Sequence, residues 1–118
     1  FVGASVVASN SGNDVTVTLS STVFSRTAVS SSITASVNSS ILGVSGTAAI
    51  NIRLPSANSY SAGQKFLVKD ESGAADTKNI SILTSGSQTI DGRSSITLES
   101  PYAAVNIYSD GTSKFFVY

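Results

Sequence analysis

The sequence predicts an all-β fold, and its pattern indicates an antiparallel β-sandwich formed by a single domain over residues 1–118. First, short segments such as 48–54 alternate between apolar and polar residues with a period of two, which is typical of strands with one buried face. Second, turn-forming residues separate these segments at intervals of roughly 8–12 residues, as in sandwiches and jelly rolls. Third, no window carries a helical period, and valine, isoleucine, threonine and phenylalanine, which favour strands, dominate the segments.

The expected strands follow from this alternation in order along the chain. The last two form the clearest hairpin, because Asp110-Gly111 between them is typical of a two-residue turn. The expected strands are 2–8, 14–19, 22–29, 33–37, 47–54, 64–70, 79–83, 88–90, 95–99, 103–109 and 114–118.

Residues 29–45 are open to two interpretations. Their serine runs are compatible with a flexible linker, whereas Ile33, Val37, Ile41, Leu42 and Val44 would give strands and loops apolar side chains to bury. We favour strand and loop. No internal repeat of fixed period is visible, which disfavours a solenoid of short coils.

The composition excludes several classes of function. Seven Lys and Arg residues balance seven Asp and Glu residues, so no basic field for nucleic acid is expected. Cysteine, histidine, methionine and tryptophan are all missing from the sequence, which excludes disulfides, thiolate metal sites and imidazole chemistry. No cofactor is expected, and the apolar runs are too short for insertion into a membrane. Because the chain starts at Phe1, we interpret it as a piece of a longer protein.

A series of motifs runs through the second half of the chain, namely IRLP at 52–55, GQKFLVKDESG at 63–73, NISI at 79–82, QTIDG at 88–92, VNIYSDG at 105–111 and FFVY at 115–118. Through these motifs the chain, from Ile50 onward, resembles the C-terminal modules of tailed-phage tail fibres, tailspikes and tail-needle knobs. The resemblance implies a β-sandwich of jelly-roll, tumour-necrosis-factor-like form that assembles as a homotrimer at the distal end of a fibre. It divides the chain into Ser/Thr/Val-rich strands at 1–45 and a tip-like part at 46–118. The family often carries a tryptophan in the final strand, where this chain has Lys114-Phe115-Phe116, and this departure weakens any inference about a shared ligand.

Catalytic residues are not expected. Serine is abundant, but a Ser-His-Asp nucleophile is impossible without histidine, and no Gly-x-Ser-x-Gly elbow occurs. Paired carboxylates could hydrolyse a glycoside. However, three of the acids lie beside turn residues, which favours a role in turns. The acids considered are Asp70, Glu71, Asp76, Asp91 and Glu99.

Five residues are candidates for ligand binding. Tyr60 and Tyr102 lie in expected loops, where exposed rings could stack on sugars, whereas we expect most other aromatic residues in the core or at subunit contacts. Arg53, Lys65 and Lys69 lie on expected strands. Near a three-fold axis they would need acids from a neighbouring subunit or a bound anion. The simpler interpretation, which we favour, is that they are the solvent-facing positions of half-buried strands.

Together these points predict a non-enzymatic homotrimeric tip of a phage tail appendage. It would be exposed on the virion, joined to the rest of the appendage upstream of Phe1, and would bind a bacterial surface glycan or outer-membrane receptor. One alternative is the trimerising or glycan-holding end of a tailspike depolymerase. Another is a monomeric bacterial adhesin or carbohydrate-binding domain. A heptad coiled coil upstream would indicate a fibre or needle, and stacked β-coils would indicate a depolymerase spike.

Overall fold

The structure is a computed structural model that describes residues 4–11, 14–21 and 24–118. These residues form twelve strands and one short 3-10 helix, so the all-β prediction is confirmed. The elements are β1 (Ala4–Ser11), β2 (Asp14–Ser21), β3 (Arg26–Val29), β4 (Ile33–Thr34), β5 (Ile41–Val44), β6 (Ile50–Arg53), η1 (Ala57–Ser59), β7 (Lys65–Asp70), β8 (Ile80–Leu83), β9 (Thr89–Ile90), β10 (Ser95–Leu98), β11 (Ala104–Ser109) and β12 (Lys114–Val117).

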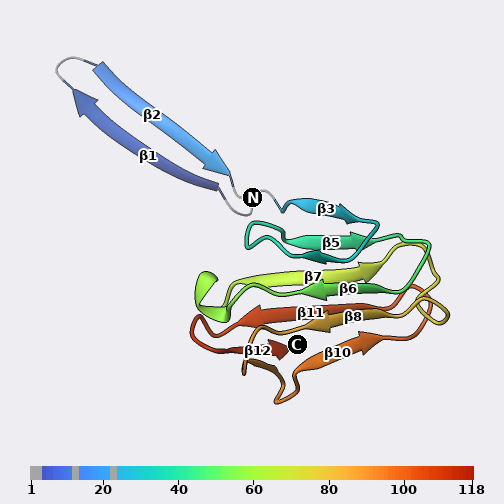
Figure 1. The fold of residues 1–118 in the computed structure, drawn as a ribbon. Coiled ribbons are helices and arrows are strands. Elements are labelled where there is room, and N and C mark those ends of the chain that lie inside the picture. The colour runs from blue at the N-terminus through green and yellow to red at the C-terminus, as the bar shows by residue number, and fades with distance from the viewer. Residues whose placement is uncertain (1–3, 12–13, 22–23) are drawn as a thin grey trace.

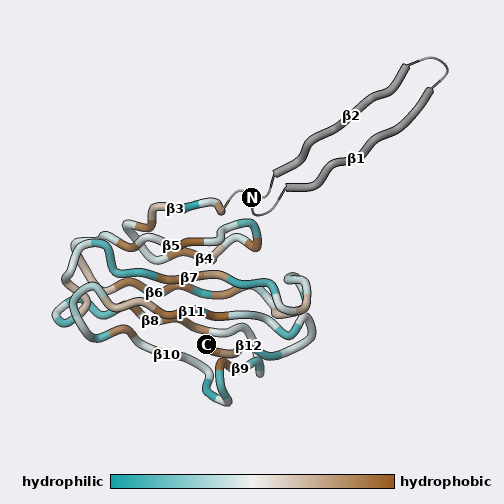
Figure 2. The backbone as a smooth tube through the Cα atoms, turned by 180° about the vertical axis from the view of Figure 1, so that it is seen from behind, coloured by the Kyte–Doolittle hydropathy of each residue, from teal (hydrophilic) through white to brown (hydrophobic). Residues whose placement is uncertain are grey.

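Two sheets pack face to face and enclose one hydrophobic core (Figure 1). The large sheet has the order β3-β5-β7-β11-β12-β9, and the small sheet has the order β10-β8-β6-β4. In Figure 2 the hydrophobic positions lie mainly on these strands and the hydrophilic ones mainly in the connecting loops. Residues from both sheets are almost completely buried between them, including Leu42, Val68, Ile107 and Phe115 from the large sheet and Ile52 and Ile82 from the small one.

From β3 to β8 the chain winds as a coil that alternates between the two sheets. Strands β3, β5 and β7 are parallel neighbours in the large sheet, and β4, β6 and β8 are parallel neighbours in the small sheet. The antiparallel prediction is therefore wrong for these strands, as is the expectation against a coil. The number of residues per turn of the coil is not constant. Far fewer residues separate Arg26 from its partner Ile41 than separate Ile41 from its partner Leu67.

The C-terminal strands close this coil mainly with antiparallel pairs, although β9 and β12 are parallel neighbours, against the antiparallel prediction. Strand β11 pairs with both β7 and β12, and β10 pairs with β8. The predicted β11–β12 hairpin is confirmed, but its two-residue turn is wrong. The connection spans residues 110–113, because the Asp110 N–H bonds to the Lys114 carbonyl at 2.9 Å. The Asp110 carboxylate holds this longer loop by accepting bonds from three backbone N–H groups, those of Thr112, Ser113 and Lys114.

Strands β1 and β2 form a separate antiparallel hairpin, with Ala4 opposite Ser21 and Ser11 opposite Asp14. Within the described parts of the chain they pair only with each other, and Figure 1 shows the hairpin extending away from the two packed sheets. The turn predicted at 11–14 includes residues 12–13, which lie outside the described residues. The boundary that the resemblance implied at residue 45 does not separate the sheets, because β3, β4 and β5 belong to the same two sheets as the strands that follow.

Candidate functional site

The outer face of the large sheet carries most of the outward-pointing aromatic side chains. Along β7 every second residue is buried, so that Lys65, Leu67 and Lys69 point away from the core. The same alternation in β11 and β12 turns further residues outward, because Ile107 and Phe115 point inward. We call this surface the aromatic face, and it is formed by Lys65, Leu67, Lys69, Asn106, Tyr108, Phe116 and Tyr118.

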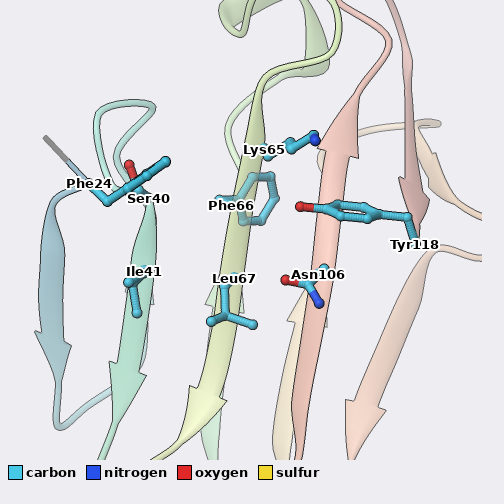
Figure 3. A pocket seen from close by; sticks show the side chains of 8 residues that line it. All are labelled: Phe24, Ser40, Ile41, Lys65, Phe66, Leu67, Asn106 and Tyr118. Atoms are coloured by element: carbon cyan, nitrogen blue, oxygen red, sulfur yellow. The ribbon is translucent and has the colours of Figure 1, made fainter. Parts of the chain in front are cut away.

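A groove with a volume of about 260 Å³ crosses the aromatic face. Figure 3 shows Phe24 on one side of it and Tyr118 on the other, with Leu67 and Asn106 between them. These two aromatic side chains are unusually open to solvent, with exposed fractions of 71% for Phe24 and 54% for Tyr118. An apolar hollow with a few polar groups at its edge is the usual form of a small-ligand site. The lining residues are Phe24, Ser40, Ile41, Lys65, Phe66, Leu67, Asn106 and Tyr118.

Contacts with neighbouring side chains hold Tyr118 in place at the edge of the groove. Its ring lies 5.8 Å from the ring of Tyr108, which in turn lies 5.5 Å from the ring of Phe116. The ammonium of Lys65 lies 5.3 Å from the centre of the Tyr118 ring, within reach of a cation–π interaction. Lys65 has no acidic partner among the described side chains. It is therefore a free cation beside the groove.

A second lysine and tyrosine pair lies further along β7. The Lys69 ammonium lies 5.6 Å from the centre of the Tyr102 ring and also donates a hydrogen bond to the Tyr102 carbonyl. Tyr102 adopts a left-handed backbone conformation, with φ of 60°, and its ring packs over Gly73, where an added Cβ would lie 2.6 Å from it. With an exposed fraction of 60%, Tyr102 is accessible, as expected from its loop position.

Arg53 lies on the opposite side of the molecule, on the outer face of the small sheet. Along β6 the buried residues are Ile50 and Ile52, so Arg53 points outward, and its Nη1 donates to the Thr84 carbonyl at 3.1 Å. It borders a shallow, polar hollow of about 300 Å³ that also includes Thr34 and Asn51. The three predicted cations are therefore divided between two faces, with Lys65 and Lys69 together and Arg53 apart. All three side chains point away from the core that the two sheets enclose.

Comparison of the sequence with protein-family models gave no match. Comparison with curated protein sequences gave no match either. The assignment of a function therefore depends on the site itself.

Tyr60 was expected to be exposed, and this prediction is wrong. Its side chain is 3% exposed and stacks on Phe66, with ring centres 5.4 Å apart, while the edge of Phe115 meets it at 5.7 Å. The short helix η1, with Ala57 fully buried, precedes Tyr60 and sends it into the core. Burial raises the pKa of the Tyr60 phenol to about 12, because the charged form would lose its hydration.

Asp70 has the turn role that the neighbouring Ser72-Gly73 predicted. Its carboxylate is 1% exposed and accepts bonds from the backbone N–H groups of Ser72, Gly73, Ala75 and Tyr102 and from the Ser72 hydroxyl, at 2.9–3.0 Å. Burial alone would raise its pKa, but these bonds outweigh burial and lower the pKa to about 2. The carboxylate therefore fixes the loop after β7 and, through the Tyr102 N–H, the position of Tyr102.

Glu71 is bound to a partner as well. Its carboxylate forms an ion pair with the Arg26 guanidinium, and this hydrogen bond lowers the pKa of Glu71. Among the side chains that the structure describes, no cluster of three acidic, histidine or cysteine residues has the geometry for a metal ion. In the described parts of the chain, no helix has the length and apolar character needed to cross a bilayer.

Sequence reasoning missed the residues that give the aromatic face its character. It expected most aromatic residues in the core or at subunit contacts, and the structure excludes the core for Phe24, Tyr108, Phe116 and Tyr118, which lie on the outer surface, the last beside Asn106. The alternation could have identified two of them. Since Ile107 and Phe115 are the inward residues of their strands, their neighbours Tyr108 and Phe116 must point outward.

Proposed function

We propose that this chain is a non-enzymatic, homotrimeric tip of a phage tail appendage that binds glycans of the bacterial surface through the groove on the aromatic face. The observation that carries the proposal is the groove between two exposed aromatic side chains, Phe24 and Tyr118. A soluble domain gains nothing in stability from such exposure, and exposed apolar patches usually mark interaction sites.

The chemistry of the groove suits a sugar. The face of an aromatic ring is electron-rich and attracts the C–H groups of a pyranose, which carry partial positive charge. The Tyr118 ring offers such a face, and Asn106 supplies an amide that can donate to and accept from hydroxyl groups. Asn106 lies on β11, and the Tyr118 N–H bonds to the Asn106 carbonyl at 3.1 Å, so the sheet positions both residues and limits the conformational entropy lost when a sugar binds.

The trimer is supported by the size of the chain. A domain of 118 residues buries only about two-thirds of its unfolded surface, and association would bury more. The jelly-roll form does not enter the proposal. A jelly roll is built from antiparallel strands, whereas β3 to β8 form a parallel coil.

That coil favours a second candidate, the trimerising or glycan-holding end of a tailspike depolymerase. Further parallel coils could stack on β3 and β4, which are edge strands of the two sheets, with the β1–β2 hairpin inserted in the chain between them. The two candidates share the glycan-binding groove. They differ in whether the parent particle cleaves the glycan that it binds.

Binding of the purified chain to a panel of bacterial lipopolysaccharides and capsular polysaccharides tests the proposal. We expect at least one polysaccharide to bind, and we expect Tyr118→Ala and Phe24→Ala each to weaken that binding about tenfold. Thr97→Ala, on the exposed outer face of the small sheet, is the control and should bind as the wild type does. No reducing ends should be released during incubation. The proposal fails if no polysaccharide binds, or if folded groove variants bind as tightly as the wild type.

A further inference from the structure

We infer that the aromatic face takes an extended acidic oligosaccharide that lies along β7, with its carboxylates at Lys65 and Lys69. This inference rests on the proposed function and specifies its ligand. It follows from the charge of the face, from the spacing of its two lysines, and from the tyrosine that accompanies each of them.

The aromatic face carries its cations on the sheet and its acids at the margins. Lys65, Lys69 and Lys114 point outward from the large sheet. Glu71, at the edge, is paired with Arg26 and also attracts Lys69, while Asp110 lies near Lys114. Lys65 has no acidic partner among the described side chains, so an anionic ligand can approach the face there.

The two lysines form a pair of similar subsites on a single strand. Lys65 and Lys69 are four residues apart on the same face of β7, so their Cα atoms are separated by about 13 Å. Each ammonium lies over a tyrosine ring, Lys65 over Tyr118 and Lys69 over Tyr102. The half-buried Leu67 lies between them. This arrangement repeats a charge and a ring along one line, which matches a polymer that repeats a carboxylate and a sugar ring.

Both ammonium groups keep donors for a ligand. An ammonium has three N–H donors, and Lys69 uses one of them for the Tyr102 carbonyl. A neutral sugar would leave these charges without a partner. A second copy of the same face would bring like charges together, which is unfavourable. An acidic oligosaccharide satisfies the lysines and the rings at once.

The test compares an oligomer of galacturonic acid with its methyl ester, which has the same ring and no charge. Binding of each to the purified chain is measured by isothermal titration calorimetry. We expect the acid to bind more tightly than the ester, and its affinity to fall as salt is added. Lys65→Gln and Lys69→Gln should each weaken the acid roughly three- to tenfold and weaken the ester by less than the acid. Arg53→Gln removes the same charge from the opposite face and should have no effect.

Each outcome supports or overturns a stated claim. If the ester binds as tightly as the acid, or if the lysine variants keep full affinity, the acidic ligand is wrong and the glycan groove stands. If Arg53→Gln weakens binding as much as Lys65→Gln, the attraction comes from total charge and not from this face. If neither oligomer binds and the polysaccharide panel also fails, the proposed function falls with the inference.

Discussion

At the scale of single residues, Asp70 links the stability of the domain to the shape of its binding surface. Its carboxylate joins two loops that are distant in sequence, because it accepts bonds from Ala75 in one and from Tyr102 in the other. The pKa of Asp70 is lowered from 3.8 to about 2 in the folded chain. A group with a lowered folded pKa stabilises the fold at pH values above its unfolded pKa. That stability is lost as the pH falls through the folded pKa.

We predict that Asp70→Asn lowers the free energy of unfolding at neutral pH by about 2–4 kcal/mol. The amide would turn an N–H donor toward backbone donors that now meet a carboxylate oxygen. Urea unfolding followed by circular dichroism measures the effect. Asp70 should account for about 2 kcal/mol of the stability that the wild type loses between about pH 5 and pH 2, and the variant should lose less over that window. Asp76→Asn, at an exposed position, is the control. Parallel pH profiles for wild type and Asp70→Asn would contradict this role.

The exposure of two loop tyrosines could not be predicted from the sequence. Tyr60 and Tyr102 both lie in loops, and both were expected to be exposed, but only Tyr102 is. The difference arises from contacts that are distant in sequence. Tyr60 fills a space beside Phe115, which lies in the last strand. Tyr102 is held outside the core by Asp70 and rests on Gly73. No local pattern encodes either contact.

At the scale of elements, the loop between β11 and β12 fits closely against the loop before β7. Gly111 has a φ of 78°, and an added Cβ there would lie 2.8 Å from the Ala62 backbone nitrogen. Backbone atoms cannot move aside as a flexible side chain does. Gly86 offers a comparison, because its φ is also positive, at 57°, but nothing lies within 4 Å of its added Cβ.

We predict that Gly111→Ala destabilises the domain more than Gly86→Ala does. Both variants incur the strain of a left-handed residue, about 1–2 kcal/mol. Only Gly111→Ala adds a collision with backbone, which should cost about 1–3 kcal/mol more. Thermal melting of the two variants beside the wild type measures the difference. Equal melting temperatures would mean that the two loops are not packed as described.

The strands with a clear alternation were predicted best. Strands β6, β7, β8, β10, β11 and β12 all fall within expected ranges, because each has one buried and one open face. Strands β3, β4 and β9 also fall within expected ranges, and the strand-and-loop interpretation of residues 29–45 is confirmed by β4 and β5. Strand β5 was nevertheless given no range of its own. It lies between two parallel neighbours, three of its four residues are buried, and Gly43 interrupts its pattern. The parallel coil was also missed, since alternation fixes which side chains point inward but not which sheet the chain enters next.

Part of the candidate site could be named from the sequence. Lys65 and Lys69 were candidates because they are charged residues on an otherwise apolar strand, and the structure places both at its outward positions. The groove beside them requires Phe24, Ile41 and Tyr118 to meet across strands that are far apart in sequence. Only the order of strands in the large sheet brings these residues together.

At the scale of the whole molecule, the proposed assembly makes a direct prediction. The chain has a mass of 12.0 kDa, and analytical ultracentrifugation at micromolar concentration should give a species of about three times that mass. Association would add buried area to a core that is limited by the size of the chain. A clean monomer would exclude the homotrimer and favour an adhesin or a carbohydrate-binding domain that acts alone.

The strand order also determines how the body would respond to mechanical load. Strand β3 is the first strand of the large sheet and β12 is the fifth, so tension between Phe24 and Tyr118 would run across the strands, along the direction of their hydrogen bonds. Each ladder between neighbouring strands would then carry the load in series. Strand β3 has four residues and a single neighbour, β5. Its ladder with β5 has four residue pairs, but the ladder between β11 and β12 has only three, so β12 would separate first and take Tyr118 away from the groove.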